Sequence, residues 1–308
     1  MHAPSGPHAP TTRRRLRLAV ACFALLLATS AALIAAGSVP SAGAASGAAA
    51  VASPTPQASP RAFVKHPQPV PILVYHHVQP YKAGYYLIYV GTAQFASQLS
   101  YLHHNGYHPV TLRRVYDAWT GRAKLPRRPV VLSFDDGYLD QYTNAAHLLH
   151  RHHYSAVLDL VVHNGTALSG TMVRRMIAWG WEVDSHTLTH PLLTHLTASQ
   201  LRHQLVASKR IIRQRFHVPV DFLCYPGGIY DHRVMRAVRA AGYLGATTIH
   251  SGRATPRARF AMPRIAVYWG ESLGTFGMRL RTAPRMNPPH ASGDAVEALL
   301  RRATTPAP

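Results

Sequence analysis

Acidic residues are scarce in this chain: 12 Asp and Glu stand against 33 Lys and Arg among 308 residues, for a formal net charge of +21. Cysteine is scarcer still, with only Cys22 and Cys224. Two cysteines exclude a small scaffold stapled by disulfides, so a hydrophobic core of normal size must hold the fold. An apolar content of 47% is sufficient for such a core.

The excess of positive charge would suit an anionic partner such as nucleic acid, an anionic envelope polymer or a membrane surface. The basic residues are, however, mostly scattered arginines, and they form no stripe with interleaved aromatic residues. We interpret the charge as compositional bias and expect no specific nucleic-acid partner. No obligate protein partner is evident in the sequence.

Charge is absent altogether from residues 18–39, which follow Arg13, Arg14, Arg15 and Arg17. A basic start, an apolar run and the small residues after it are typical of an export signal. The run is also long enough to span a bilayer as an uncleaved anchor. Residues 1–40 are therefore expected to be a signal peptide or a membrane anchor, which predicts a protein that is secreted or attached to the outer face of the cytoplasmic membrane.

Three further regions follow this segment. Residues 41–69 are rich in Ala, Ser and Pro and indicate a flexible linker, and residues 277–308 indicate a loose tail with one helical turn near 295–302. Between them, residues 70–276 alternate strand-like and helix-like segments, which favours parallel βα units in a barrel or a doubly wound sheet. The expected strands cover 70–78, 130–136, 154–162, 181–186, 221–226 and 245–249, and the expected helices cover 92–106, 144–153, 169–180, 197–216 and 231–242.

In a chain so poor in acids, the adjacent pair Asp135 and Asp136 stands out at the end of the apolar run VVLSFDDGY. Adjacent side chains of a strand point to opposite faces, so both can serve one site only where the strand ends. Gly137 follows directly and can permit that turn. A bound cation would offset the repulsion between the two carboxylates. A helix cap followed by a turn is the simpler alternative.

A second motif, DSHTLTHP, places His186 and His190 four residues apart, a spacing that can aim two imidazoles at one metal. In a chain with 21 histidines this pair alone is a weak signal. The conjunction is stronger, because the aspartates, the histidines and a Pro-Gly-Gly turn at Gly227 each follow a predicted strand. Two N ligands, one O ligand and a free fourth position are typical of a catalytic zinc site.

The motifs LSFDDGY, SHTLTHP and CYPGGIYD, in that order, resemble the polysaccharide deacetylase family (NodB-homology domain, carbohydrate esterase family 4). The opening ILVYHHV is similar to the branch that contains poly-N-acetylglucosamine deacetylases. The resemblance spans about residues 70–270. It implies an α/β fold with a distorted (β/α) barrel, a single catalytic domain, and metal-dependent removal of acetyl groups from an N-acetylglucosamine polymer of the cell envelope or matrix.

The resemblance also implies roles for individual residues. Asp135 would be the general base and His76 the general acid, although His77 beside it is an alternative. The metal would be held by Asp136, His186 and His190, and would be zinc or else cobalt, nickel or manganese. The backbone near Gly227 would stabilise the oxyanion. Family members often carry Arg where Cys224 stands here, and Arg264 is a candidate to pair with Asp135 instead.

Aromatic residues near the motifs could contact a sugar or could simply belong to the core; they are Tyr138, Tyr225, Tyr230 and Trp269. Two rival functions also remain. One is a carbohydrate-binding barrel at the cell surface with weak or no catalysis. The other is a basic protein that coats nucleic acid or an anionic polymer around a structural metal site, although no fourth protein ligand is evident for such a site.

Overall fold

The structure, a computed structural model of the chain, describes residues 67–81, 86–164 and 168–285. The expected export signal or anchor, most of the expected linker and the helical turn expected near 295–302 lie outside these residues. Among the residues described, none of the helices combines the length and the apolar character that crossing a membrane would require.

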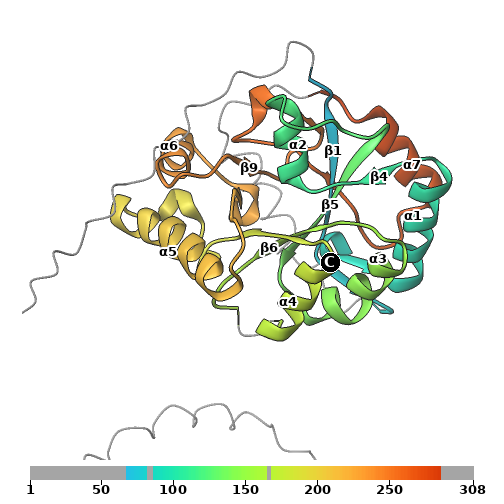
Figure 1. The fold of residues 1–308 in the computed structure, drawn as a ribbon, viewed down its shortest axis with the longest axis horizontal. Helices are drawn as coiled ribbons and strands as arrows, with labels where there is room; N and C mark the ends of the chain where they lie inside the picture. Colours follow the sequence, from blue (N-terminus) through green and yellow to red (C-terminus); the bar gives the residue numbers. More distant parts are fainter. Residues whose placement is uncertain (1–66, 82–85, 165–167, 286–308) are drawn as a thin grey trace, which may run out of the picture. The chain divides into compact units, whose positions relative to one another are not determined.

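Each of the six segments predicted as strands contributes a strand to one sheet, and these six strands run parallel to one another (Figure 1). Runs such as Val130–Val131–Leu132 are buried on both faces, as expected for a parallel sheet covered by helices. The sheet has the order β10-β1-β5-β6-β7-β8-β9. Its strands are β1 (Val70–Tyr75), β5 (Pro129–Asp136), β6 (Val157–Leu160), β7 (Glu182–Ser185), β8 (Phe222–Cys224), β9 (Gly245–Thr247) and β10 (Arg253–Ala254).

The sheet curls toward closure through a segment that follows β10. The backbone N–H of Ala246 donates to Arg259 O at 2.7 Å, and that of Met262 donates to Ala246 O at 2.8 Å. The next strand, β11 (Ile265–Ala266), then pairs in parallel with β1 on the other side. The resulting ring, irregular where β10 runs antiparallel to β1, confirms the expected distorted barrel.

The predicted helices form between the strands and agree with the expected bounds within one or two residues, except that the helix expected over 144–153 begins earlier, as a π-helix, and its α-helical part covers only His147–Arg151. Ser169, Thr197 and Asp231 accept backbone hydrogen bonds at the first turns of their helices. Gly180 and Gly242 follow helices with φ of 90° and 76°, conformations that favour glycine. The helices are α1 (Thr92–His104), α2 (Leu112–Trp119), α3 (His147–Arg151), α4 (Gly170–Ala178), α5 (Ala198–Phe216), α6 (His232–Ala240) and α7 (Leu273–Thr282), and a π-helix (Gln141–Ala146) leads into α3.

Two helices were not predicted, although the sequence carried a signal for one. For α2 the signal is the cap at Thr111 and buried Leu112, Val115 and Trp119 on one face. Helix α7 continues past residue 276, where the tail was expected to begin, and buries Phe276 and Leu280. The expected boundary therefore falls inside a packed helix, which lies against α1 (Figure 1).

Three short strands complete the set of strands in the part of the chain that the structure describes. Strands β2 (His77–Gln79) and β3 (Tyr89–Gly91) form a parallel pair beside the carboxyl end of β1. Strand β4 (His108–Pro109) pairs with the start of β5. Strands β1, β5, β7 and β8 all end at the same edge of the barrel because they are parallel, and this edge carries the residues that the motifs single out.

Candidate active site

Asp135 and Asp136 lie side by side in sequence but occupy different surroundings, because β5 ends at Asp136 and the chain turns there. Asp135 is still in the strand and its side chain is buried inside the barrel, 3% exposed. Asp136 and Gly137 both adopt positive φ, 76° and 83°, which turns the chain over the barrel edge. A non-glycine residue in this region is uncommon and often marks a functional site. The turn lets adjacent carboxylates face one site, as expected from the sequence.

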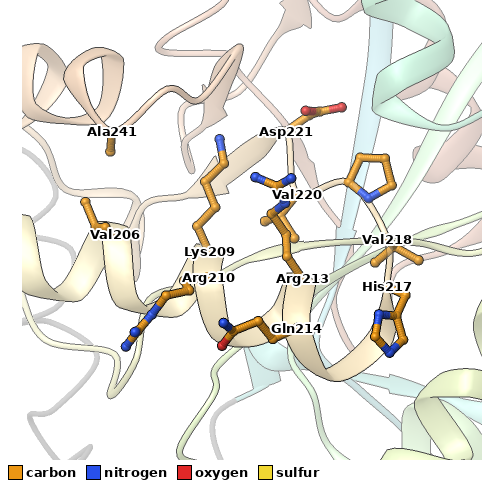
Figure 2. A pocket seen from close by; sticks show the side chains of 11 residues that line it. Val206, Lys209, Arg210, Arg213, Gln214, His217, Val218, Val220, Asp221 and Ala241 are labelled. Carbon is orange, nitrogen blue, oxygen red and sulfur yellow. The ribbon is translucent and has the colours of Figure 1, made fainter. Parts of the chain in front are cut away.

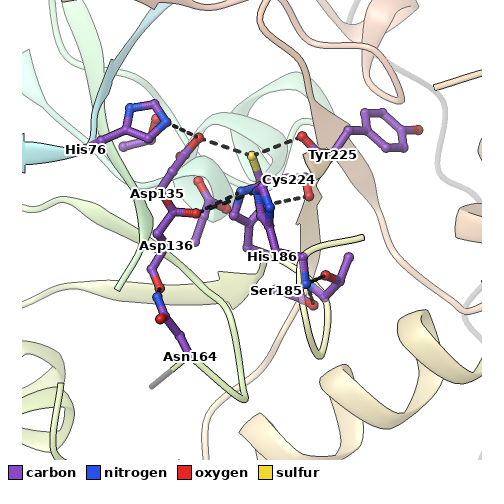
Figure 3. A network of polar contacts seen from close by, with 12 residues as sticks. His76, Asp135, Asp136, Asn164, Ser185, His186, Cys224 and Tyr225 are labelled. Atoms are coloured by element: carbon purple, nitrogen blue, oxygen red, sulfur yellow. Dashed lines mark hydrogen bonds and ion pairs between the residues drawn. The ribbon is translucent and has the colours of Figure 1, made fainter. Parts of the chain in front are cut away.

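Asp136 converges with the histidine pair that follows β7. Its Oδ1 lies 3.5 Å from Nε2 of His186 and 3.6 Å from Nε2 of His190. His186 is buried, whereas the His190 side chain is 42% exposed. The structure therefore brings together the three residues expected as metal ligands, with the exposed His190 on the solvent side of the cluster. Figure 3 shows how Asp136 and His186 face one another.

The chemistry of these three side chains fits a divalent metal ion. Nδ1 of His186 lies 2.8 Å from the carbonyl oxygen of Cys224. Since a carbonyl can only accept, Nδ1 carries the proton and the lone pair of Nε2 faces Asp136. Two imidazole nitrogens and one carboxylate oxygen, with an open side, match a site that keeps a position for water or substrate.

A second cluster of Asp135, His186 and Cys224 also places its polar atoms close together, but it fits a cation poorly. The Arg264 guanidinium lies 3.3 Å from Cys224 Sγ and would repel a metal ion. Burial also raises the pKa of the Cys224 thiol, which therefore stays protonated. The site with Asp136 is accordingly the better metal site.

Arg264 forms a buried, two-pronged ion pair with Asp135. Its Nη1 donates to Asp135 Oδ1 at 2.7 Å and its Nη2 to Oδ2 at 2.8 Å. Further donations go to Thr248 O at 2.8 Å and to Ser133 Oγ at 3.2 Å. Burial alone would raise the pKa of Asp135, but the guanidinium more than offsets this and holds the pKa well below its usual range. The sequence-based pairing of Arg264 with Asp135 is thus present in the structure.

The two adjacent histidines after β1 point to different neighbours. His76 Nε2 lies 3.7 Å from Asp135 Oδ2 (Figure 3), whereas His77 Nδ1 lies 2.8 Å from Asp140 Oδ2. Burial lowers the pKa of His76, partly offset by the nearby carboxylates, so its resting form near neutral pH is the free imidazole. Of the two histidines, only His76 faces the barrel-edge carboxylate.

The third motif forms a tight turn at the same edge, but its aromatic residues belong to the core. Gly227 and Gly228 adopt φ of 61° and 70°, and a side chain on Gly228 would collide with Ile249. Tyr225 is fully buried and its hydroxyl donates to Phe260 O at 2.9 Å. Tyr230 is buried as well and stacks on Tyr225. A role for Tyr225 toward substrate can therefore come only from its backbone.

A separate groove of about 970 Å³ lies along the second half of α5 (Figure 2). It is lined by cations that include Lys209, Arg210 and Arg213, and by Asp221, which pairs with Arg113 at 2.6 Å. Asp221 directly precedes β8, so the groove lies at the opposite end of that strand from the histidines and carboxylates. None of the predicted site residues lines it.

Comparisons with known proteins find several polysaccharide deacetylases that are similar to this chain. The sequence profile of the family named Polysaccharide deacetylase matches residues 122–246. YxkH of Bacillus subtilis (strain 168), provisionally named a polysaccharide deacetylase, is 28% identical over 222 residues, which cover 70% of this chain and 78% of YxkH. Poly-beta-1,6-N-acetyl-D-glucosamine N-deacetylase of Escherichia coli (strain K12) is 24% identical over 260 residues. That match covers 70% of this chain but only 39% of the longer Escherichia coli protein.

The fold has close counterparts among solved structures. The deacetylase PplD of Streptococcus pyogenes, determined in complex with acetate, superposes with a TM-score of 0.66 at 20% sequence identity. The superposition covers 70% of this chain and 99% of PplD. At this level of identity the likeness concerns the fold alone.

Proposed function

Because this chain belongs to the polysaccharide deacetylase family, we propose that it is a metal-dependent enzyme that removes N-acetyl groups from an N-acetylglucosamine-containing polysaccharide. The single observation that carries the proposal is the convergence of Asp136, His186 and His190 next to a buried, ionised Asp135. The deacetylase named for poly-beta-1,6-N-acetyl-D-glucosamine among its relatives supports this class of substrate. We place the enzyme outside the cytoplasm, on the strength of the N-terminal sequence.

Asp136, His186 and His190 would hold the metal, which we propose to be zinc, with cobalt, nickel or manganese as substitutes. A divalent ion at this position supplies Lewis-acid chemistry that polarises a carbonyl and lowers the pKa of water. His190, on the open side, lies where the polymer would approach. The backbone of the turn at Gly227 lies at the same edge and would donate to the developing oxyanion.

Asp135 would act as the base that takes a proton from the attacking water. Arg264 keeps this carboxylate ionised, but the same ion pair makes it a base that does not hold a proton tightly. His76, 3.7 Å away and uncharged at rest, can take the proton over and deliver it to the departing amine. The pair thus moves one proton from water to the leaving nitrogen, as hydrolysis of an amide requires.

The experiment is an assay of acetate release from N-acetylglucosamine oligomers and from peptidoglycan. Zinc-loaded wild-type protein, chelator-treated protein and Asp135→Asn would run in parallel. Asp117→Asn is the matched control, since Asp117 pairs with Arg113 and Arg122 away from the site. Acetate that appears only in the zinc-loaded wild type and the Asp117→Asn control supports the enzyme. If the wild type binds zinc but releases no acetate from any substrate, the result would favour a carbohydrate-binding barrel.

A further inference from the structure

A small pocket of about 240 Å³ lies at the opposite end of β5 from the two aspartates. Pro129, the first residue of β5, lines it, and so does Arg253, which pairs with Pro71 at the start of β1. Pockets for drug-sized ligands measure about 300–1,000 Å³, so this one suits a small ion or ester rather than a glycan chain. We name it the arginine pocket. Its other lining residues are Gln68, Pro69, Tyr107, Arg128 and Arg281.

Three guanidinium groups line the arginine pocket, and no carboxylate of the described residues does. Arg128, Arg253 and Arg281 carry the charge, and the other lining residues are uncharged. Among the ion pairs of the part of the chain that the structure describes, none involves any of these three arginines. Three like charges around one pocket repel one another, and a bound anion would offset this repulsion.

Hydrogen bonds hold two of these guanidinium groups against the end of α7. Nη2 of Arg253 donates to the carbonyl oxygens of Leu280 at 3.0 Å and Arg281 at 2.7 Å. Nη1 of Arg281 donates to the Tyr101 hydroxyl at 2.6 Å. The Nε–H of Arg253 is buried and has no acceptor among the described residues. Since a guanidinium has five N–H donors, both groups keep donors for a ligand.

Arg128 is fixed beside the arginine pocket by its backbone and by its side chain. Its φ is 46°, and the backbone N–H of His108 donates to its carbonyl oxygen at 3.0 Å. Its Nη1 donates to Asn105 O at 2.5 Å. The centre of its guanidinium lies 5.7 Å from the ring centroid of Tyr107. A side chain that is already held in place loses little conformational freedom when a ligand binds.

We propose that the arginine pocket binds a phosphate group, either as the free ion or as the end of a small phosphate ester. Guanidinium groups present paired N–H donors that match the oxygen atoms of phosphate. Three positive charges favour a phosphate group with two negative charges over a carboxylate with one. The site goes beyond the proposed deacetylase function, since it lies at the other end of β5 from the proposed metal ligands.

A phosphate group at this place would stabilise the fold and take no part in the chemistry. The lining residues come from the chain before β1, from the starts of β1 and β5, from β10 and from the end of α7. Residues at the amino-terminal end of barrel strands generally serve stability. A ligand that binds only the folded state stabilises it as the ligand concentration rises above Kd. Phosphate should therefore raise the Tm of the protein.

The test measures Kd of the full chain for inorganic phosphate and for glycerol 3-phosphate by calorimetric titration, at an ionic strength held constant with sodium chloride. Thermal unfolding with and without phosphate is the second readout. Arg128→Gln and Arg281→Gln change exposed residues, and each should weaken phosphate binding about 10-fold or more by removing charge-assisted hydrogen bonds. Arg127→Gln is the matched control, because Arg127 is exposed, directly precedes Arg128 and does not line the pocket.

Tighter binding in the wild type and the control than in the two pocket variants, with a Tm that rises with phosphate, would support the site. The probe with the lower Kd then identifies the ion or the ester as the preferred form. An equal loss of affinity in Arg127→Gln and Arg128→Gln would overturn the site, because phosphate binding would then follow net charge alone. Unchanged affinity in both pocket variants, or no binding by the wild type, would overturn it too. These measurements use no deacetylase substrate, so their result is independent of the proposed function.

Discussion

Arg264 and Asp135 are 129 residues apart in sequence, yet they form a buried pair joined by two parallel hydrogen bonds of 2.7 and 2.8 Å. The pair links the end of β5 with the segment that precedes β11 and closes the barrel. Both side chains are 3% exposed, so water does not screen their attraction. The ion pair thereby joins the base of the proposed reaction to the element that completes the fold.

Replacing Arg264 by Gln should therefore affect stability and chemistry together. Leaving Asp135 buried without its partner should lower the free energy of unfolding by about 3–5 kcal/mol. The pKa of Asp135 should rise, which moves the acid limb of the pH profile of kcat/KM to higher pH. Denaturant unfolding and the pH profile measure the two effects. An unchanged acid limb would show that Arg264 does not set the basicity of the active carboxylate.

Replacing His76 by Gln should slow the reaction without weakening metal binding. The residue lies 3.7 Å from Asp135 and outside the expected ligand set. Loss of a positioned acid or base typically lowers kcat about 10²- to 10⁴-fold. Kinetics with zinc-affinity measurements would check this, and His108→Gln, at an exposed histidine, is the control. If the His76→Gln variant kept the full kcat, His76 would not be the group that delivers the proton to the leaving amine.

Replacing Gly137 by Ala should disturb the turn that separates the two aspartates. Its φ of 83° disfavours a side chain, and an added Cβ would lie 2.7 Å from Leu160 Cδ1. Gly106→Ala is a matched control, because its φ is 66° but its Cβ would meet nothing within 4 Å. Backbone strain should destabilise both variants by about 1 kcal/mol. Only Gly137→Ala should also lose zinc affinity, and equal affinity in both variants would contradict this reading of the turn.

Glu182, at the start of β7, should make the protein less stable as pH rises. Burial raises its pKa to about 7, partly offset by a hydrogen bond from the backbone N–H of Arg113. Between its ordinary pKa of about 4.3 and 7, the folded state holds a proton that the unfolded state has released, so stability falls with increasing pH. Glu182→Gln should reduce the stability difference between pH 5 and pH 8 by about 1–3 kcal/mol. Denaturant unfolding at the two pH values checks this, and an unchanged difference would assign the pH dependence to other groups.

Much of the fold could be predicted because its signals are local. The apolar runs that form β1, β5 and β6, and the caps at Ser169, Thr197 and Asp231, depend on residues close together in sequence. Helix α7 was missed because its place is set by packing against α1, and such long-range contacts leave no short periodic pattern. Its glycines also have a low helix propensity, so the local sequence favours a loop.

The sequence by itself determined the chemistry available at the site, since three motifs after three strands supply two carboxylates and two histidines for one barrel edge. Only the tertiary structure decided which of these groups lie at the metal site and which lie beside it. The backbone turn at Asp136, the reach of Arg264 across the barrel, and the opposite directions of His76 and His77 are all set by contacts between segments far apart in the chain. The pKa of Asp135 depends on its burial and on its distance from Arg264, and the packing of Tyr138 depends on its neighbours. The closed barrel determines all of these.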